Sequence, residues 1–387
     1  MKKLRLVLPV IVISQFCCTS LWFAGNGVMN DLVKNFGLKE SAIGHLTSAV
    51  QLGFIAGTLV FAILTIADRY SPSKVFLASA LFGSFFNLGL IWEGNNLTSL
   101  LCLRILTGFF LAGIYPVGMK IAADYYEKGL GKSLGYLVGA LVIGTSFPHL
   151  LKDLAETLPY KYVISTTSSL AVLGGSLMAI LVPDGPYRKP GQKPDISAFF
   201  KVFQNGNFRS AAFGYFGHMW ELYAFWAFVP VILKTYSRMH PESSFNIPLL
   251  SFFIIGSGGL ACVLAGYIAQ SKGTKTTAFT ALMLSFGCCL VSPLIFEMTH
   301  AYLFLGFLLF WGMVVIADSP LFSTLIAQNA APEIKGTALT IVNCIGFSVT
   351  IISIQLISGM RELTNSNAIY SILAIGPVLG LMSLRRK

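Results

Sequence analysis

Twelve apolar stretches recur from one end of this chain to the other. Each spans roughly 20 residues, the length that a helix needs to cross the hydrocarbon core of a bilayer. We place them at residues 6–29, 42–66, 74–92, 97–124, 131–151, 162–182, 209–233, 247–269, 276–297, 300–328, 335–359 and 366–384. The pattern predicts an all-α membrane protein with twelve transmembrane helices.

The composition agrees with a chain that lies mostly in lipid. Of its 387 residues, 55% are hydrophobic and only 11% are charged, whereas a soluble domain carries about 25% charged residues. The basic start followed by an apolar run resembles a signal peptide, but the eleven further spans favour a retained first helix. All seven cysteines fall inside apolar segments, and no Cys/His cluster is present. We therefore expect neither disulfides nor a metal or other cofactor.

The net charge of +11 follows the membrane topology. With the N-terminus inside, eighteen basic residues fall in cytoplasmic loops and seven in outer loops, while Arg104 and Lys120 lie within a span. This positive-inside bias predicts that both termini are cytoplasmic. We expect a monomer in the bacterial cytoplasmic (inner) membrane, with lipid as its surroundings. The basic charge is therefore not a signal for a nucleic-acid partner.

A basic segment at residues 183–208 divides the spans into two groups of six. We expect an N-terminal six-helix bundle at 1–182, a cytoplasmic linker at 183–208 and a C-terminal six-helix bundle at 209–387. The two groups also carry matching features. The loop "LTIADRYSPSK" after the second span corresponds to "GYIAQSKGTK" after the eighth, and Pro116 corresponds to Pro320. The halves are therefore predicted to be pseudo-symmetric repeats, a plan used by secondary transporters.

These motifs resemble those of the major facilitator superfamily (MFS), and the resemblance covers the whole chain. Asp68, Arg69 and Lys74 match parts of its loop motif Gly-x-x-x-Asp-Arg-x-Gly-Arg-Lys. A second copy keeps both glycines but replaces the acid; its residues are Gly266, Gln270 and Gly273. Arg104 and Gly108 resemble the superfamily's Arg-x-x-x-Gly motif in the fourth span.

The resemblance implies alternating access of a small-molecule site near the membrane midplane, between two six-helix halves. It also implies that Asp68 belongs to a cytoplasmic gate, where it would bond the start of the eleventh span near residues 334–336. The alternative is a solvated loop aspartate paired with Arg69 or Lys74.

Charged groups inside spans are costly and are therefore functional candidates. Glu221 lies twelve residues into the seventh span, which places it about 18 Å along the helix and near the midplane. His218 shares its helical face. Desolvation favours the neutral acid, so a cavity-facing Glu221 is suited to carry protons or to contact substrate, with His218 sharing the charge. The alternative is a structural glutamate hydrogen-bonded to His218 or to a neighbouring helix.

Asp318 lies two residues before Pro320, which is expected to kink the tenth span because it lacks a backbone donor. This suggests a hinge or site element; the alternative is an ion pair with Arg104 or Lys120. Arg104 itself is expected to meet an anionic group or Glu221. Lys120 is expected to pair locally with Asp124, four residues later.

Two further groups of side chains are candidates for contact with the solute. Gln15, Thr19, Trp22 and Asn26 recur at helical spacing along the first span, where they either line a cavity or pack against other helices. The aromatic wall of Trp220, Tyr223, Phe225 and Trp226 suits an organic solute with an apolar part. His149, beside Pro148 near the outer end of the fifth span, is expected at the membrane interface.

The sequence thus favours a proton-coupled secondary transporter of a small organic solute. A sensor with the transporter fold but without net transport, and a sodium-coupled carrier, remain as alternatives. An enzyme is not expected, because no catalytic cluster is present at a membrane surface and no phosphate-binding Gly-x-x-x-x-Gly-Lys loop occurs.

Overall fold

The computed structural model describes residues 2–126, 130–154, 158–188, 202–331, 335–364 and 366–385. Within these ranges all regular secondary structure is helical. Eleven helical segments there are long and apolar enough to cross a membrane, and a shorter apolar helix, Leu6–Thr19, accompanies them. These twelve segments confirm the predicted all-α membrane class.

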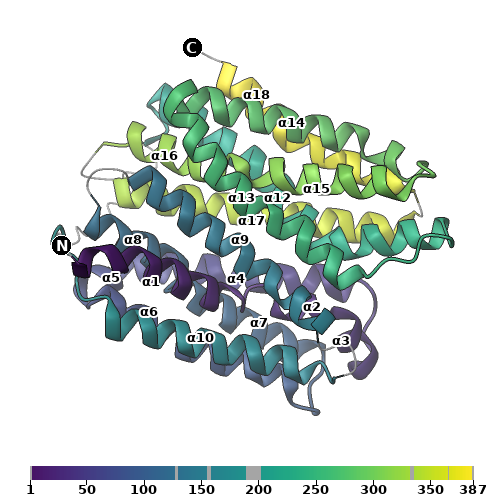
Figure 1. The fold of residues 1–387 in the computed structure, drawn as a ribbon, viewed down its shortest axis with the longest axis horizontal. Helices are drawn as coiled ribbons and strands as arrows, with labels where there is room; N and C mark the ends of the chain where they lie inside the picture. The colour runs from purple at the N-terminus through teal and green to yellow at the C-terminus, as the bar shows by residue number, and fades with distance from the viewer. Residues whose placement is uncertain are drawn as a thin grey trace. The chain divides into compact units, whose positions relative to one another are not determined.

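The chain divides into two compact units, Met1–Ile196 and Ser197–Lys387. Each unit is described by itself below. The helices of the first unit are α1 (Lys2–Thr19), α2 (Ala24–Gly27), α3 (Met29–Phe36), α4 (Ala42–Ile63), α5 (Ile66–Arg69), α6 (Pro72–Leu88), α7 (Leu97–Leu111), α8 (Tyr115–Tyr125), α9 (Leu130–Leu154) and α10 (Lys161–Leu181) (Figure 1).

Helices α4 and α7 approach closely because glycines line their contact. A Cβ atom on Gly53 would lie 1.9 Å from the carbonyl oxygen of Ile105, and one on Gly108 would lie 2.0 Å from that of Val50. Only hydrogen fits in either place. Gly57, one turn after Gly53, likewise meets the carbonyl of Phe109, at 2.2 Å, as is typical of small residues spaced four apart in membrane helices.

The second unit contains the longest of the described helices, α12, which forms the seventh span and carries Glu221. Its helices are α12 (Gly206–Met239), α13 (Ile247–Lys272), α14 (Thr274–Ile295), α15 (Ala301–Ala317), α16 (Ser319–Asn329), α17 (Lys335–Leu363), the 3₁₀ helix η3 (Asn367–Ala374) and α18 (Ile375–Arg385). Asn205 caps α12, because its side chain accepts from the backbone N–H groups of Asn207 and Phe208 at 2.9 and 3.2 Å. The helix therefore begins inside the segment 183–208 that we expected to be a linker.

Glycine contacts also set the spacing within this second unit. A Cβ atom on Gly217 of α12 would lie 2.3 Å from the carbonyl of Gly376 in α18, and one on Gly312 of α15 would lie 2.0 Å from that of Ile254 in α13. Gly273 alone joins α13 to α14, at a φ of 87° that side chains with a Cβ rarely adopt. These approaches hold α12 against α18 and α15 against α13.

Candidate functional site

Two spans are broken at matching places. The fourth span divides between α7 and α8 at residues 112–114, and the tenth divides between α15 and α16 at Asp318. Pro116 and Pro320 each lie in the first turn of the second segment, where a missing backbone donor is tolerated. The break that Pro320 predicted is therefore present. It places Asp318, only 1% exposed, at the joint.

At this joint Asp318 meets His218 of α12. The His218 Nδ1 and Asp318 Oδ1 atoms lie 2.8 Å apart, and both side chains are buried. Within the second unit Asp318 thus pairs with a histidine, while its pairing with Arg104 or Lys120 of the first unit stays a prediction. The remaining ring nitrogen of His218 and the Oδ2 atom of Asp318 are buried without a hydrogen-bond partner among the described residues. Polar atoms in that state call for a water, an ion or a proton.

Glu221 lies one turn beyond His218 and is held by two other helices. Its Oε1 atom accepts hydrogen bonds from Ser285 Oγ of α14 and from Trp311 Nε1 of α15, each at 2.5 Å. The Cys289 thiol is a further hydrogen-bonding neighbour, and Asp318 lies near enough to interact with Glu221 electrostatically. These hydrogen bonds to neighbouring helices are the ones expected if Glu221 has a structural role. His218 does not share them, because it contacts Asp318. We call Glu221, His218 and Asp318 the acid–histidine cluster.

The aromatic side chains near Glu221 mostly fill contacts between helices. Trp220 donates from Nε1 to the carbonyl of Ile372 at 3.2 Å and lies against Gly376. The Phe225 ring packs on Trp311 at a centroid distance of 4.4 Å. Tyr215, one turn before His218, donates to Asn343 of α17 at 3.1 Å. A substrate role for Trp220 stays a prediction.

In the first unit, Arg104 of α7 bonds to the backbone of the first span. It donates to the carbonyl oxygens of Leu21, at 3.1 Å, and of Trp22. These carbonyls are freed because the first span is itself interrupted between Thr19 and Ala24. Arg104 thus meets backbone oxygen, whereas the sequence suggested an anionic group or Glu221. No acid among the described residues pairs with it.

The polar line of the first span makes contacts within this unit. Asn26 donates to the hydroxyl of Thr47 in α4 at 2.8 Å, and Thr19 donates to the carbonyl of Gln15 at 2.8 Å. The Trp22 ring packs on Phe54 at 4.8 Å. Gln15 is fully buried beside Gly118, and neither of its amide atoms has a hydrogen-bond partner in the described part of the chain. His149 is buried within this unit, with 3% of its surface exposed, and its place at the membrane interface stays a prediction.

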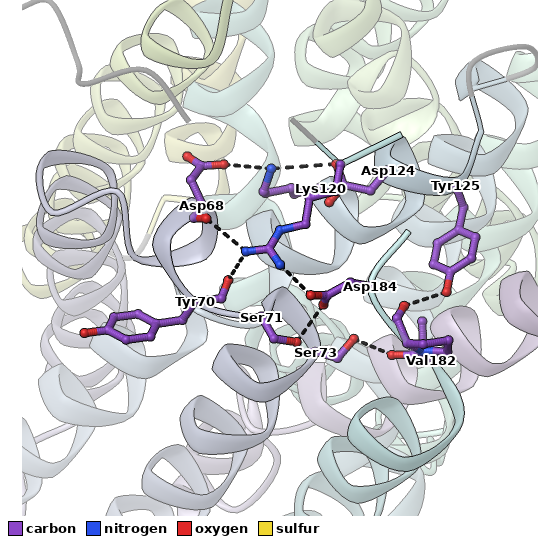
Figure 2. Close-up of polar contacts among 11 residues, drawn as sticks. Asp68, Tyr70, Ser71, Ser73, Lys120, Asp124, Tyr125, Val182 and Asp184 are labelled. Atoms are coloured by element: carbon purple, nitrogen blue, oxygen red, sulfur yellow. Dashed lines mark hydrogen bonds and ion pairs between the residues drawn. The ribbon is translucent and has the colours of Figure 1, made fainter. Parts of the chain in front are cut away.

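The loop motif of the first unit centres on Lys120, as Figure 2 shows. Lys120 Nζ lies 2.7 Å from Asp68 Oδ1 and 3.7 Å from Asp124 Oδ1. The local Lys120–Asp124 pair was expected, but the Asp68–Lys120 pair was not. Arg69 instead lies over the Tyr70 ring at 5.8 Å. The sequence offered no signal for the Asp68 partner, which is fifty-two positions away and in another span.

A segment following the sixth span, residues 182–188, crosses the same region, and we call it the strap. Arg188 donates to the carbonyls of Asp68, at 2.9 Å, and Tyr70, at 2.8 Å, and also bonds Asp184. Ser71 donates to Asp184 at 2.6 Å, and Tyr125 donates to the carbonyl of Pro183 at 2.5 Å. The strap therefore joins the second-to-third-span loop to the end of α8.

The second copy of the loop motif lacks the charged residues that build this network, Lys120 and its two acids. Gly266 lies inside α13, Gln270 is exposed near its end, and Gly273 closes it. In the first unit, Lys120 and Asp124 lie four and eight residues after Pro116. At the same distances from Pro320, the second unit has Thr324 and Gln328, which carry no charge. The expected bond from Asp68 to residues 334–336 involves Ile334, which lies outside the described residues.

A sequence profile of the Major Facilitator Superfamily matches residues 11–354. The chain belongs to the major facilitator superfamily. This membership confirms the resemblance noted in the loop and fourth-span motifs. It makes the chain a multi-pass integral membrane protein of a transporter family, which points to a transporter rather than an enzyme.

Solved MFS structures share this fold at low identity. A human organic anion transporter, MFSD10 (TETRAN), superimposes with a TM-score of 0.76 at 13% identity, covering 99% of each chain. A bacterial homologue of the human lysosomal transporter Spinster, inward-facing and unoccupied, superimposes with a TM-score of 0.67 at 13% identity. The superposition covers 99% of this MFS chain and 94% of the homologue's chain. A search of curated protein sequences found no match.

Proposed function

We propose that this MFS protein is a secondary active transporter that moves a small organic solute by alternating access, coupled to protons through the acid–histidine cluster. The observation that carries the proposal is the contact between His218 and Asp318 at the break in the tenth span. One group is an acid and the other a base, both are buried, and each keeps one polar atom without a partner within the described chain.

The pair can hold its charge balance in two ways. An ionised Asp318 beside a protonated His218 is neutral overall, and so is a protonated Asp318 beside a neutral imidazole. A proton needs only to cross the 2.8 Å between Oδ1 and Nδ1 to interchange these states. A second proton makes the pair cationic, and burial then favours its release once water reaches the site. Uptake and release therefore follow access to water.

The helix break connects this proton step to movement. Asp318 is the single residue between α15 and α16, so a change in its bond to His218 acts on the angle between the two segments. Glu221 acts on the same helix, because Trp311 lies seven residues before Asp318, about two turns along one face. A protonated Glu221 accepts more weakly from Trp311 and Ser285, which loosens α12 from α15 and α14. Protonation in the cluster thus weakens contacts that hold these helices together.

Purified protein in liposomes containing a pH-sensitive dye tests the proposal. Amino acids, organic acids, sugars and cationic drugs would be added to wild type and to Asp318→Asn, His218→Gln and Glu221→Gln. Glu297→Gln, which changes an exposed acid at the outer end of α14, is the matched control. We expect a solute-dependent pH change in wild type and in the control, and its loss in Asp318→Asn and His218→Gln.

Exchange of labelled solute at equal pH on both sides separates coupling from folding. The cluster variants should still exchange the solute that moves protons in wild type, because exchange requires no net proton transfer. Proton flux that persists in all three variants would contradict the proposal. Flux that follows a sodium gradient and ignores pH would establish the sodium-coupled alternative, and binding without flux would establish the sensor.

A further inference from the structure

The joint in the tenth span holds more acid than base. Asp318 pairs with His218 at 2.8 Å, and Glu221 lies near enough to Asp318 to interact with it electrostatically. All three residues are 1% exposed. No lysine or arginine of the described second unit forms an ion pair with either acid. Buried acids attract a cation, so the group that occupies the place of that cation decides which ion the joint accepts.

Oxygen atoms at this joint suit an alkali cation. The Oδ2 atom of Asp318 is buried and has no hydrogen-bond partner among the described residues. Pro320 has no N–H group to give to the carbonyl of Ile316, four residues earlier. This carbonyl accepts instead from the Asp318 backbone and from the Cys262 thiol, at 3.4 Å. A thiol is a weak donor, and hard cations prefer carboxylate and carbonyl oxygens, so the broken helix supplies part of a sodium site.

The imidazole of His218 stands where such a cation would lie. Its Nδ1 atom faces Oδ1 of Asp318, and the rings of Tyr215 and Phe322 neighbour it at centroid distances of 6.0 and 6.1 Å. Phe322 in turn packs against the α12 backbone at Gly214, where a Cβ atom would lie 2.4 Å from its ring. The imidazole is therefore confined beside the carboxylate, and it covers Oδ1.

A proton fits this arrangement, whereas a sodium ion does not. The proton lies on Oδ1 or on Nδ1, within the 2.8 Å that separate the two atoms, as the hydrogen of a hydrogen bond. A sodium ion needs several oxygen ligands around it. The imidazole offers nitrogen and carbon, and the Tyr215 hydroxyl is bonded to Asn343 of α17. The α12 side of Asp318 thus lacks the oxygen atoms that sodium requires.

We infer that His218 determines the coupling ion, because its imidazole fills the place of an alkali cation beside Asp318 and so admits a proton and excludes sodium. This inference rests on the proposed function for the statement that the selected ion is the coupled one. Removal of the ring should open the same place to sodium, with Asp318, the Ile316 carbonyl and water as its ligands.

Thermal melting of the purified full-length protein in detergent tests the inference. Each variant is melted in sodium chloride and in choline chloride at equal ionic strength, so that screening and any loss of stability from the substitution itself cancel. We expect wild type to melt at the same temperature in both salts. For His218→Ala we expect a saturable rise in sodium, by about 3–6 °C at a concentration about tenfold above its Kd. Binding of radioactive sodium to the immobilised protein gives that Kd directly.

Three companion variants locate the effect. His218→Ser, whose hydroxyl can itself bind the cation, should respond to sodium as His218→Ala does, and it replaces the alanine variant if that variant does not fold. His218→Ala/Asp318→Asn should lose the response, because it lacks the charged ligand. His45→Ala, which changes an exposed histidine of the first unit, is the matched control and should behave as wild type.

Three outcomes would overturn the inference. A sodium-specific rise in wild type would show that the ring does not exclude the ion. Folded His218→Ala and His218→Ser that melt equally in both salts would show that the ring is not what keeps sodium out. A response that persists in His218→Ala/Asp318→Asn would place the bound ion elsewhere in the protein.

Proton coupling is judged separately, by the pH change in liposomes. Wild type without a solute-dependent pH change, together with sodium binding in His218→Ala, would remove the proposed coupling and keep the exclusion of sodium by His218. Proton flux in wild type, with no sodium response in either histidine variant, would keep the coupling and remove this inference alone.

Discussion

Lys120 serves two acids, and its removal should therefore cost more than the removal of either acid. Lys120 Nζ lies 2.7 Å from Asp68 and 3.7 Å from Asp124. Coulomb's law with an effective dielectric constant of about 20 gives gross attractions of about 6 and about 4.5 kcal/mol. The Lys120 and Asp68 side chains are 25% and 29% exposed, so screening and side-chain entropy reduce these values strongly. We expect net contributions of about 1 kcal/mol for Asp68 and about 0.5 kcal/mol for Asp124.

The two kinds of variant differ in what they leave behind. Asp68→Asn keeps Lys120 paired with Asp124, whereas Lys120→Met leaves the two carboxylates without the cation that they share, and only Arg188 remains near them. We therefore expect a loss of about 2 kcal/mol for Lys120→Met. For a unit of this length, 1 kcal/mol shifts the melting temperature by about 2–4 °C. Lys120→Met should thus melt about 4–8 °C below wild type and Asp68→Asn about 2–4 °C below.

Thermal melting in detergent at pH 7 measures these shifts, at low salt and at about 0.5 M salt, where screening should reduce them. The double variant Asp68→Asn/Lys120→Met should be less destabilised than the sum of its parts by about 1 kcal/mol. If Lys120→Met melts no lower than Asp68→Asn, or if the two effects add, then Lys120 does not hold the two acids together and the reasoning fails.

Three further outcomes follow from other contacts. Gly108→Ala should lower the melting temperature far more than Gly287→Ala, because the new methyl lies 2.0 Å from the Val50 carbonyl in one case and in open space in the other; equal shifts would mean that α4 and α7 separate without cost. Tyr125→Phe removes the bond to Pro183 and should speed tryptic cleavage after Arg188, while Tyr162→Phe, which changes an exposed tyrosine, should leave the cleavage rate unchanged. The Lys161 ammonium holds the pKa of Glu93 below its usual value. The pair therefore stabilises the folded protein at pH values above the pKa that Glu93 has in the unfolded chain, and this stabilisation is lost as the pH falls through the pKa that Glu93 has in the folded protein. Because the Glu93 side chain is 86% exposed and that of Lys161 40% exposed, solvent screens the pair. Glu93→Gln should therefore follow the wild-type melting curve from pH 7 to pH 3.5, and a divergence would show a stronger pair than we expect.

Much of the fold was predictable because lipid imposes a simple pattern. Apolar length alone located the spans, and Pro320 predicted the break in the tenth one. The break in the first span was not predicted, because the turn after Thr19 contains neither proline nor glycine until Gly25. Its stabilisation comes from Arg104, more than eighty positions away. Local sequence carries no trace of such a partner.

The candidate site shows the same division between local and distant information. Burial of Glu221, His218 and Asp318 followed from their places inside apolar spans, but their partners did not. His218 and Asp318 are one hundred positions apart, and Glu221 reaches Ser285 and Trp311 on two other helices. Helical spacing suggested that His218 would share the charge of Glu221, since only neighbours on one helix are visible in a single sequence. Packing between helices decided otherwise.

The matching breaks in the fourth and tenth spans carry different side chains in the two halves. Both copies keep the interrupted helix and the proline after it, yet Asp318 at one joint corresponds to an apolar stretch at the other. The charged network around Lys120 likewise exists in one copy, while Thr324 and Gln328 stand in the other. A protein assembled from two first halves would therefore lack every member of the acid–histidine cluster, and one assembled from two second halves would lack both Arg104 and the Lys120 network. Each half therefore supplies buried or paired charged groups that the other half lacks.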